Sequence, residues 1–273
     1  MNSSRPIIGI SMGDQAGIGP EVAVKALSQS NIYEVCRPVV VGEAKTMAGA
    51  SKIADMNLSL NTCPEISAAK FQCGTIDVLD LQNVNLKELR LGKISAQAGR
   101  AAFEAVRKVI ELALEKKIDA TVTGPINKES INLAGYHFAG HTEIYAHYTH
   151  TQDYAMLLVN GNLRVIHVST HVALHQACDL VKKERIIKVI ELLNETCKKF
   201  GIKKPRIGVA GLNPHASDGG LFGAEEWEEI LPAIQQAKIL GFEVAAIELA
   251  AFRHREKDIL RKWTFDLKSQ NFC

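Results

Sequence analysis

The sequence lacks the features that mark several classes of protein. Its six cysteines are scattered, with no Cys-x-x-Cys pair, which argues against a disulfide scaffold and for a reduced, cytoplasmic chain. It has no run of about 18 apolar residues and no apolar signal segment at its N-terminus, so we expect neither a membrane span nor a secretory signal. A net charge of +2 with 23% charged residues gives no global signal for binding nucleic acid. The chain also has no internal repeat and no low-complexity linker.

What the sequence does contain is enough apolar material for a large α/β protein. It has 273 residues, of which 47% are hydrophobic, a length that suits one large or two modest domains. Short apolar runs predict strands at residues 6–12, 38–41, 119–122 and 206–210, and amphipathic patterns predict helices at 19–29, 95–117, 184–200 and 225–240. Asn160-Gly161 predicts an antiparallel hairpin between residues 155–159 and 163–168. This alternation predicts a mainly parallel sheet with helices on both faces. We place one lobe at residues 1–124, a second at 125–244 and a divergent tail at 245–273.

Two predicted strands run directly into segments that contain a histidine. The strand at 206–210 is followed by Gly211 to Gly220, which includes His215 and Asp218, and the strand at 163–168 is followed by His171. Ligands of open α/β sheets bind at the carboxyl ends of strands, so the two imidazoles are candidate ligands of one divalent metal ion, which Asp218 could orient or supplement. Two histidines alone are an incomplete set, because a catalytic metal usually has three protein ligands. On spacing alone, a structural role for each histidine is the better interpretation.

Three other segments lie between a strand and a helix and carry candidate ligand-binding groups. Gly13 to Glu21 is glycine-rich but has neither the Walker nor the GxGxxG spacing, and a tight turn explains it equally well. Thr123 to Lys128 ends in a lysine that could neutralise a phosphate or carboxylate, or could simply be solvated. In Gly140 to Glu143, His141 and Thr142 are placed to donate to an anion, although Thr142 could equally be a helix cap.

Taken together and in this order, these segments resemble the family of 4-hydroxythreonine-4-phosphate dehydrogenases and their relatives that act on D-threonate and D-erythronate 4-phosphates. The matching pieces are residues 12–14, 16–21, 92–95, 123–128, 140–143, 170–171 and 212–216. Residues 164–168 and 220–223 look more like the sugar-acid phosphate branch than the vitamin B6 branch. The resemblance covers roughly residues 6–243.

The resemblance implies a fold like that of isocitrate dehydrogenase and a homodimer with its active site at the interface. It further implies that His141 and Thr142 bind substrate, and that His171 and His215 are two of three ligands of a zinc, magnesium or cobalt ion. Lys128 and Asp218 are the candidate catalytic residues, and no residue is assigned to the cofactor. The implied reaction is the NAD-dependent oxidation of a secondary alcohol in a 4-phosphorylated four-carbon hydroxy acid, followed by decarboxylation. No nucleic-acid or membrane partner is expected.

The resemblance ends after Val244. The family's later motifs, including the third metal-binding histidine, do not follow; the residues from Ala245 onward are instead rich in charge. We interpret this tail as a frameshifted or truncated end rather than a divergent helix, and His254 as a poor substitute for the third ligand. The alternative function is therefore a catalytically impaired remnant that at most binds ligands or dimerises. An acyltransferase of the phosphate acetyltransferase type is disfavoured by the His171 and His215 motifs.

Overall fold

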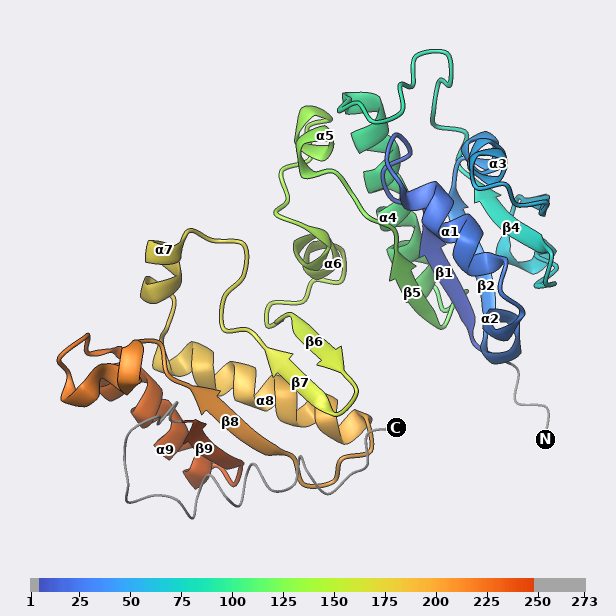
Figure 1. Ribbon diagram of the computed structural model, residues 1–273. Coiled ribbons are helices and arrows are strands. Elements are labelled where there is room, and N and C mark those ends of the chain that lie inside the picture. Colours follow the sequence, from blue (N-terminus) through green and yellow to red (C-terminus); the bar gives the residue numbers. More distant parts are fainter. Residues whose placement is uncertain (1–4, 248–273) are drawn as a thin grey trace. The chain divides into compact units, whose positions relative to one another are not determined.

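The computed structural model describes residues 5–247, which divide into two compact units after Tyr154 (Figure 1). The first unit contains, in chain order, β1 (Ile7–Ser11), α1 (Gly19–Leu27), α2 (Ser30–Val35), β2 (Arg37–Gly42), α3 (Ala44–Ile53), β3 (Ser59–Cys63), the short 3-10 turn η1 (Ile66–Ala68), β4 (Thr75–Asp80), α4 (Ala96–Leu114), β5 (Ala120–Thr123), α5 (Lys128–Leu133) and α6 (His141–Tyr148). The second contains β6 (Leu157–Asn160), β7 (Leu163–Ile166), α7 (Leu174–Asp179), α8 (Lys183–Lys199), β8 (Arg206–Ala210), the turn η2 (Pro214–Gly219), the π-helical turn η3 (Glu226–Ile230), α9 (Leu231–Ile239) and β9 (Glu243–Ile247).

The first unit is built on a five-stranded sheet with the order β3-β4-β2-β1-β5, in which every neighbouring pair is parallel. Successive residues of β2 face opposite sides of this sheet: Val40 packs with α1 and α3, whereas Val39 and Val41 pack with α4. Helices therefore cover both faces of a parallel sheet, and the predicted α/β class with a mainly parallel sheet is confirmed. The carboxyl ends of β1 and β5 lie side by side where the direction of winding reverses, which is where such sheets bind ligands.

Helix α4 has a second apolar stripe that faces away from the sheet. Phe103, Val106 and Ile110 on this stripe pack with Ile131 of α5 and Ile144 of α6. The ring of Phe103 also stacks on that of Tyr136, with centroids 3.7 Å apart. Because of this packing, residues 125–154 group with the first unit, whereas the sequence placed a lobe boundary at Gly124-Pro125.

The second unit, as far as Ile247, has a core formed by α8, α9 and two small sheets. Its β6 and β7 form the antiparallel hairpin predicted around Asn160-Gly161, and β8 pairs with β9 in parallel. Buried residues of α8, β8, η3, α9 and β9 make up one apolar cluster: Ile186, Ile190, Leu193, Cys197, Ile207, Ile230, Ala233, Ile234, Ala237 and Val244. The first three residues of the predicted tail, 245–247, belong to β9; the rest of the tail, with His254, lies outside the described residues. None of the described helices is both long and apolar enough to cross a membrane.

Candidate functional site

The glycine-rich segment after β1 forms a tight turn against the loop that follows β5. The backbone N–H of Asp14 donates to the carbonyl of Pro125 at 2.8 Å. Gly13 has a φ of +80°, and a Cβ there would overlap that same carbonyl oxygen, so the position needs glycine. The Asp14 carboxylate accepts from the N–H of Ala16 at 2.8 Å. Burial raises the pKa of Asp14, although hydrogen bonds from Ala16, Ser130 and Gly17 oppose the rise. The turn interpretation of this segment is thus correct, and a ligand-binding role stays a prediction.

Lys128 is the first residue of α5, and its side chain is exposed to solvent. The preceding Asn127 caps this helix, because its Oδ1 accepts from the N–H of Ser130 at 2.9 Å. Lys128 is thereby presented close to the carboxyl end of β5, with its ammonium group accessible to an anion. The geometry is compatible with the predicted role in binding a phosphate or carboxylate.

His141 and Thr142 are the first two residues of α6, in the same unit as Lys128. The Nε2 atom of His141 is buried and has no hydrogen-bond partner among residues 5–247. Burial lowers the pKa of His141, while a hydrogen bond to the Gly124 backbone opposes this effect. A neutral imidazole with one nitrogen bonded to the chain and the other unsatisfied is well suited to receive a polar substrate group.

The two candidate metal ligands lie in the second unit. His171 is in the segment between β7 and α7, where Arg185 of α8 donates through Nε to the carbonyl of Val168 at 3.0 Å and fixes the chain just upstream. His215 lies in η2, after β8. Both histidines are exposed, and both have positive φ angles, 59° for His171 and 54° for His215. Non-glycine residues with positive φ are uncommon and concentrate at functional sites.

The turn that carries His215 is strained over four residues in succession. His215, Ala216, Ser217 and Asp218 have φ angles of 54°, 49°, 67° and 43°. This left-handed conformation costs L-residues about 1–2 kcal/mol each, so the surrounding structure must hold it. Asp218 lies in the same turn as His215, as predicted, and is exposed.

Glu226 of η3 holds this turn in place. Its side chain is only 4% exposed, and one carboxylate oxygen accepts from the N–H groups of Leu212 and Asn213 at 2.9 and 2.7 Å. The other oxygen accepts from Asn213 Nδ2 at 2.8 Å and from the Ser217 hydroxyl. Burial alone would raise the pKa of Glu226, but these hydrogen bonds outweigh it and lower the pKa to about 2. Glu226 therefore stays ionised and organises both ends of the strained turn.

Sequence reasoning did not identify Glu226. It is one of four glutamates among residues 225–229, and such a run looks like the solvated start of a helix. Only the fold shows that this one points inward. Gln15, which lies between two of the matching segments, was also missed.

The described residues include side chains of the kinds that bind a divalent cation, but they do not form a complete metal site. Imidazole and carboxylate are donors that zinc, magnesium and cobalt accept, and His171, His215 and Asp218 provide both. No group of three ligating side chains comes together anywhere in the described part of the chain. No described residue is assigned to NAD.

Comparison with known proteins places the chain in a family. Residues 34–250 match the family model described as "Pyridoxal phosphate biosynthetic protein PdxA". Proteins provisionally named D-threonate 4-phosphate dehydrogenase are 43% identical over 244 residues in Clostridium botulinum strain Hall, and 46% identical over 246 residues in Oceanobacillus iheyensis. Each alignment covers 89% of this chain and 73% of the relative.

Solved structures agree with this placement. A crystal structure of a 4-hydroxythreonine-4-phosphate dehydrogenase from Klebsiella pneumoniae matches with a TM-score of 0.80 at 39% identity, covering 90% of this chain and 74% of that one. One from Burkholderia phymatum matches with a TM-score of 0.75 at 42% identity, covering 89% and 74%. The resemblance stated from the sequence is confirmed. The predicted enzyme class is confirmed too, because these relatives are named dehydrogenases. The chain belongs to the PdxA family.

Proposed function

We propose that this protein is an NAD-dependent and divalent-metal-dependent dehydrogenase of a 4-phosphorylated four-carbon hydroxy acid. The single observation that carries the proposal is the identity of 43–46% to named D-threonate 4-phosphate dehydrogenases over 89% of the chain. The candidate substrates are 4-hydroxythreonine 4-phosphate, D-threonate 4-phosphate and D-erythronate 4-phosphate. Oxidation of the alcohol to a ketone would release a proton and a hydride, for which NAD would be the acceptor when bound, and the resulting β-keto acid would then lose carbon dioxide.

The roles proposed for the chain's own residues follow from their chemistry. The exposed ammonium of Lys128 binds an anionic end of the substrate, and His141, neutral and with Nε2 unsatisfied, takes a polar group of the substrate together with Thr142. His171 and His215 would hold the divalent ion, with Asp218 beside His215. When bound, such an ion polarises the oxygen atoms of the hydroxyl and of the ketone. Glu226 keeps the His215 turn in its strained conformation.

The test is NADH formation by the purified chain, supplied with NAD, a divalent metal and each of the three 4-phosphates in turn. We expect turnover with one of them, and its loss in His171→Ala and His215→Ala. His175→Ala is the matched control, because His175 is an exposed histidine of α7 in the same unit. Lys128→Met should raise KM more than it lowers kcat, since it removes a charge used mainly in binding. A folded chain that is silent with all three substrates would refute the proposal and favour the impaired remnant.

The metal has a readout that does not need activity. Calorimetric titration with zinc should show binding that weakens in His171→Ala and in His215→Ala but not in His175→Ala. Equal affinity in all four proteins would exclude these histidines as ligands. The homodimer and the cytoplasmic location also stay predictions; light scattering on the purified chain measures the first.

A further inference from the structure

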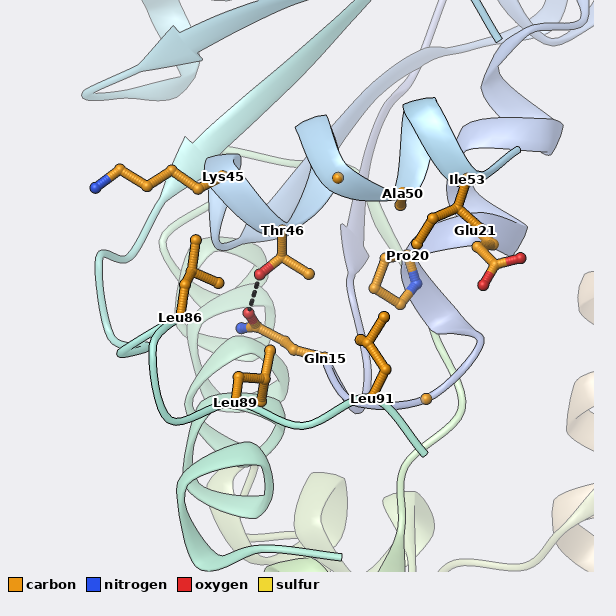
Figure 2. Close-up of a pocket in the computed structure, with 12 residues that line it drawn as sticks. Gln15, Pro20, Glu21, Lys45, Thr46, Ala50, Ile53, Leu86, Leu89 and Leu91 are labelled. Carbon is orange, nitrogen blue, oxygen red and sulfur yellow. Dashed lines mark hydrogen bonds between the residues drawn. The ribbon is translucent and has the colours of Figure 1, made fainter. Parts of the chain in front are cut away.

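The first unit contains a cavity of about 230 Å³ to which the proposed function assigns no residue. Three parts of the chain enclose it: the glycine-rich turn after β1 with the start of α1, helix α3, and the loop between β4 and α4 (Figure 2). None of the residues assigned above to substrate or metal lines it.

The wall of this cavity is mostly apolar, and three of its large apolar side chains are exposed to solvent. Leu86 and Leu91 from the loop after β4 are 40% and 61% exposed, and Ile53 at the end of α3 is 57% exposed. Leu89, Pro20 and Ala50 complete the apolar lining. Large apolar side chains that converge on a concave surface, with few polar groups among them, are typical of small-molecule sites.

One polar group in the wall is buried and unsatisfied. The side chain of Gln15 is fully buried. Its Oε1 accepts from the Thr46 hydroxyl at 3.0 Å, as Figure 2 shows, while its Nε2 has no partner among the described residues. In this arrangement the Thr46 hydroxyl occupies the amide oxygen, and the buried Nε2 group in the cavity wall is left without an acceptor. A buried donor without a partner is unfavourable, so a ligand that accepts from it gains specificity as well as affinity.

The charges around the cavity favour a neutral ligand. Its two charged lining residues are Glu21 and Lys45, which have opposite signs and lie on opposite sides of the cavity in Figure 2. The size limits the ligand further, because pockets for drug-sized molecules occupy roughly 300–1,000 Å³. A volume of 230 Å³ suits one ring rather than a whole dinucleotide.

We propose that this cavity binds a neutral, single-ring molecule with a hydrogen-bond acceptor, a carbonyl oxygen or a ring nitrogen, that accepts from Gln15 Nε2. The ring packs against Leu86, Leu89 and Leu91, and the acceptor faces the amide. This also gives the glycine-rich segment a role in binding: its tight turn holds Gln15 and Gly17 at the cavity. The inference concerns a site separate from the proposed metal and substrate groups and does not depend on the dehydrogenase activity.

The probe is benzamide, a neutral ring with a carbonyl acceptor, and the comparison is toluene, which lacks the acceptor. Their affinities for the purified full chain, without NAD or metal, are measured by ligand-detected NMR titration. We expect Gln15→Leu to weaken benzamide binding about tenfold, the loss of one hydrogen bond, and to change toluene binding less than about twofold. Gln72→Leu, the same substitution at an exposed glutamine, should leave both affinities unchanged.

A second variant keeps the test decisive if Gln15→Leu fails to fold. Gly49 lies in α3 on the cavity wall, and a Cβ there meets nothing within 4 Å. Gly49→Leu therefore fills the cavity without a clash at Cβ, and leucine is a better helix former than glycine. We expect this variant to fold and to bind neither probe.

Three results would overturn the proposal: no binding of benzamide to the natural chain, unchanged benzamide binding in a folded Gln15→Leu variant, or unchanged benzamide binding in Gly49→Leu. The same acceptor-bearing ring could be a free metabolite or part of a larger molecule such as NAD. Displacement of benzamide by NAD would identify the ring as part of the dinucleotide. If NAD does not displace benzamide, the ring belongs to a free small molecule.

Discussion

Replacing Glu226 by glutamine tests how the His215 turn is held. Glutamine retains one oxygen for the N–H groups of Leu212 and Asn213. It places an NH2 group where the other oxygen accepted from Asn213 Nδ2 and the Ser217 hydroxyl. The Ser217 hydroxyl can turn to accept from this group, but the hydrogen bond from Asn213 Nδ2 to a charged acceptor is lost, and two NH2 groups then face each other. We expect the second unit to lose stability at neutral pH.

The magnitude follows from the pKa of Glu226. Hydrogen bonding lowers this pKa from 4.5 to about 2 against the opposing effect of burial, and that difference corresponds to roughly 3 kcal/mol. Because the folded-state pKa is the lower one, this stability is fully present above pH 4.5 and is lost as the pH falls toward 2. The gap in unfolding free energy between the natural chain and Glu226→Gln should therefore be roughly 3 kcal/mol at pH 7 and about half that at pH 3.

The neighbouring Trp227 makes the measurement local. The chain has two tryptophans, so in a Trp263→Phe background the fluorescence during urea unfolding reports only on Trp227, which is 55% exposed and follows Glu226 in η3. Glu228→Gln is the matched control, because Glu228 is an exposed glutamate in the same turn, and we expect it to change stability by less than about 0.5 kcal/mol. Equal midpoints for the two variants, or a gap that does not shrink at pH 3, would refute the reasoning.

Three further substitutions test the first unit. In Gly99→Ala the new Cβ would overlap the carbonyl group of Ser130 and force α4 away from α5. Thermal unfolding should show that the free energy of unfolding falls by roughly 1–3 kcal/mol. The control is Gly49→Ala, and a melting temperature of Gly99→Ala no lower than that of the control would contradict the prediction. Asp77 is 1% exposed and accepts from the N–H groups of Lys70 and Phe71 at 2.9 and 2.7 Å. Asp77→Asn should therefore cost roughly 2 kcal/mol in urea unfolding, and an unchanged midpoint would refute this. Phe103→Ala should cost roughly 3–5 kcal/mol by the same assay, because the ring is 1% exposed and stacked; a loss below about 1 kcal/mol would show that the site collapses around the change.

The elements with a clear period were predictable from the sequence. The apolar run of β1, the amphipathic α4 and the Asn-Gly hairpin were all identified to within a few residues. The strand β3 was missed because its sequence, Ser-Leu-Asn-Thr-Cys, has little apolar character at the edge of the sheet. The strand β4 was missed because Asp77 interrupts its apolar run. That aspartate is tolerated inside because the backbone N–H groups of Lys70 and Phe71 and the side-chain amide of Asn61 all donate to it.

The residues of the candidate site also fall into those that the sequence indicated and those that only the fold revealed. His141, His171 and His215 could be singled out as candidates because short motifs surround them and the order of the motifs is specific. Gln15 and Glu226 act through groups brought to them by folding: the Thr46 hydroxyl in the first case and the backbone of residues 212–213 in the second. No local pattern distinguishes such residues from solvated ones.

Most of the buried residues in the first half of α4 have very small side chains. Ala98, Ala101, Ala102 and Ala105 have no exposed surface, and Gly99 lies against the backbone of Ser130. Close packing leaves no room for even one added methylene at such positions. In a library of random variants of this chain, we therefore expect the four alanine positions to accept almost only alanine, glycine and serine, and position 99 to accept almost only glycine. The outward-facing positions of the same helix, such as Arg107 and Glu111, should accept many different residues.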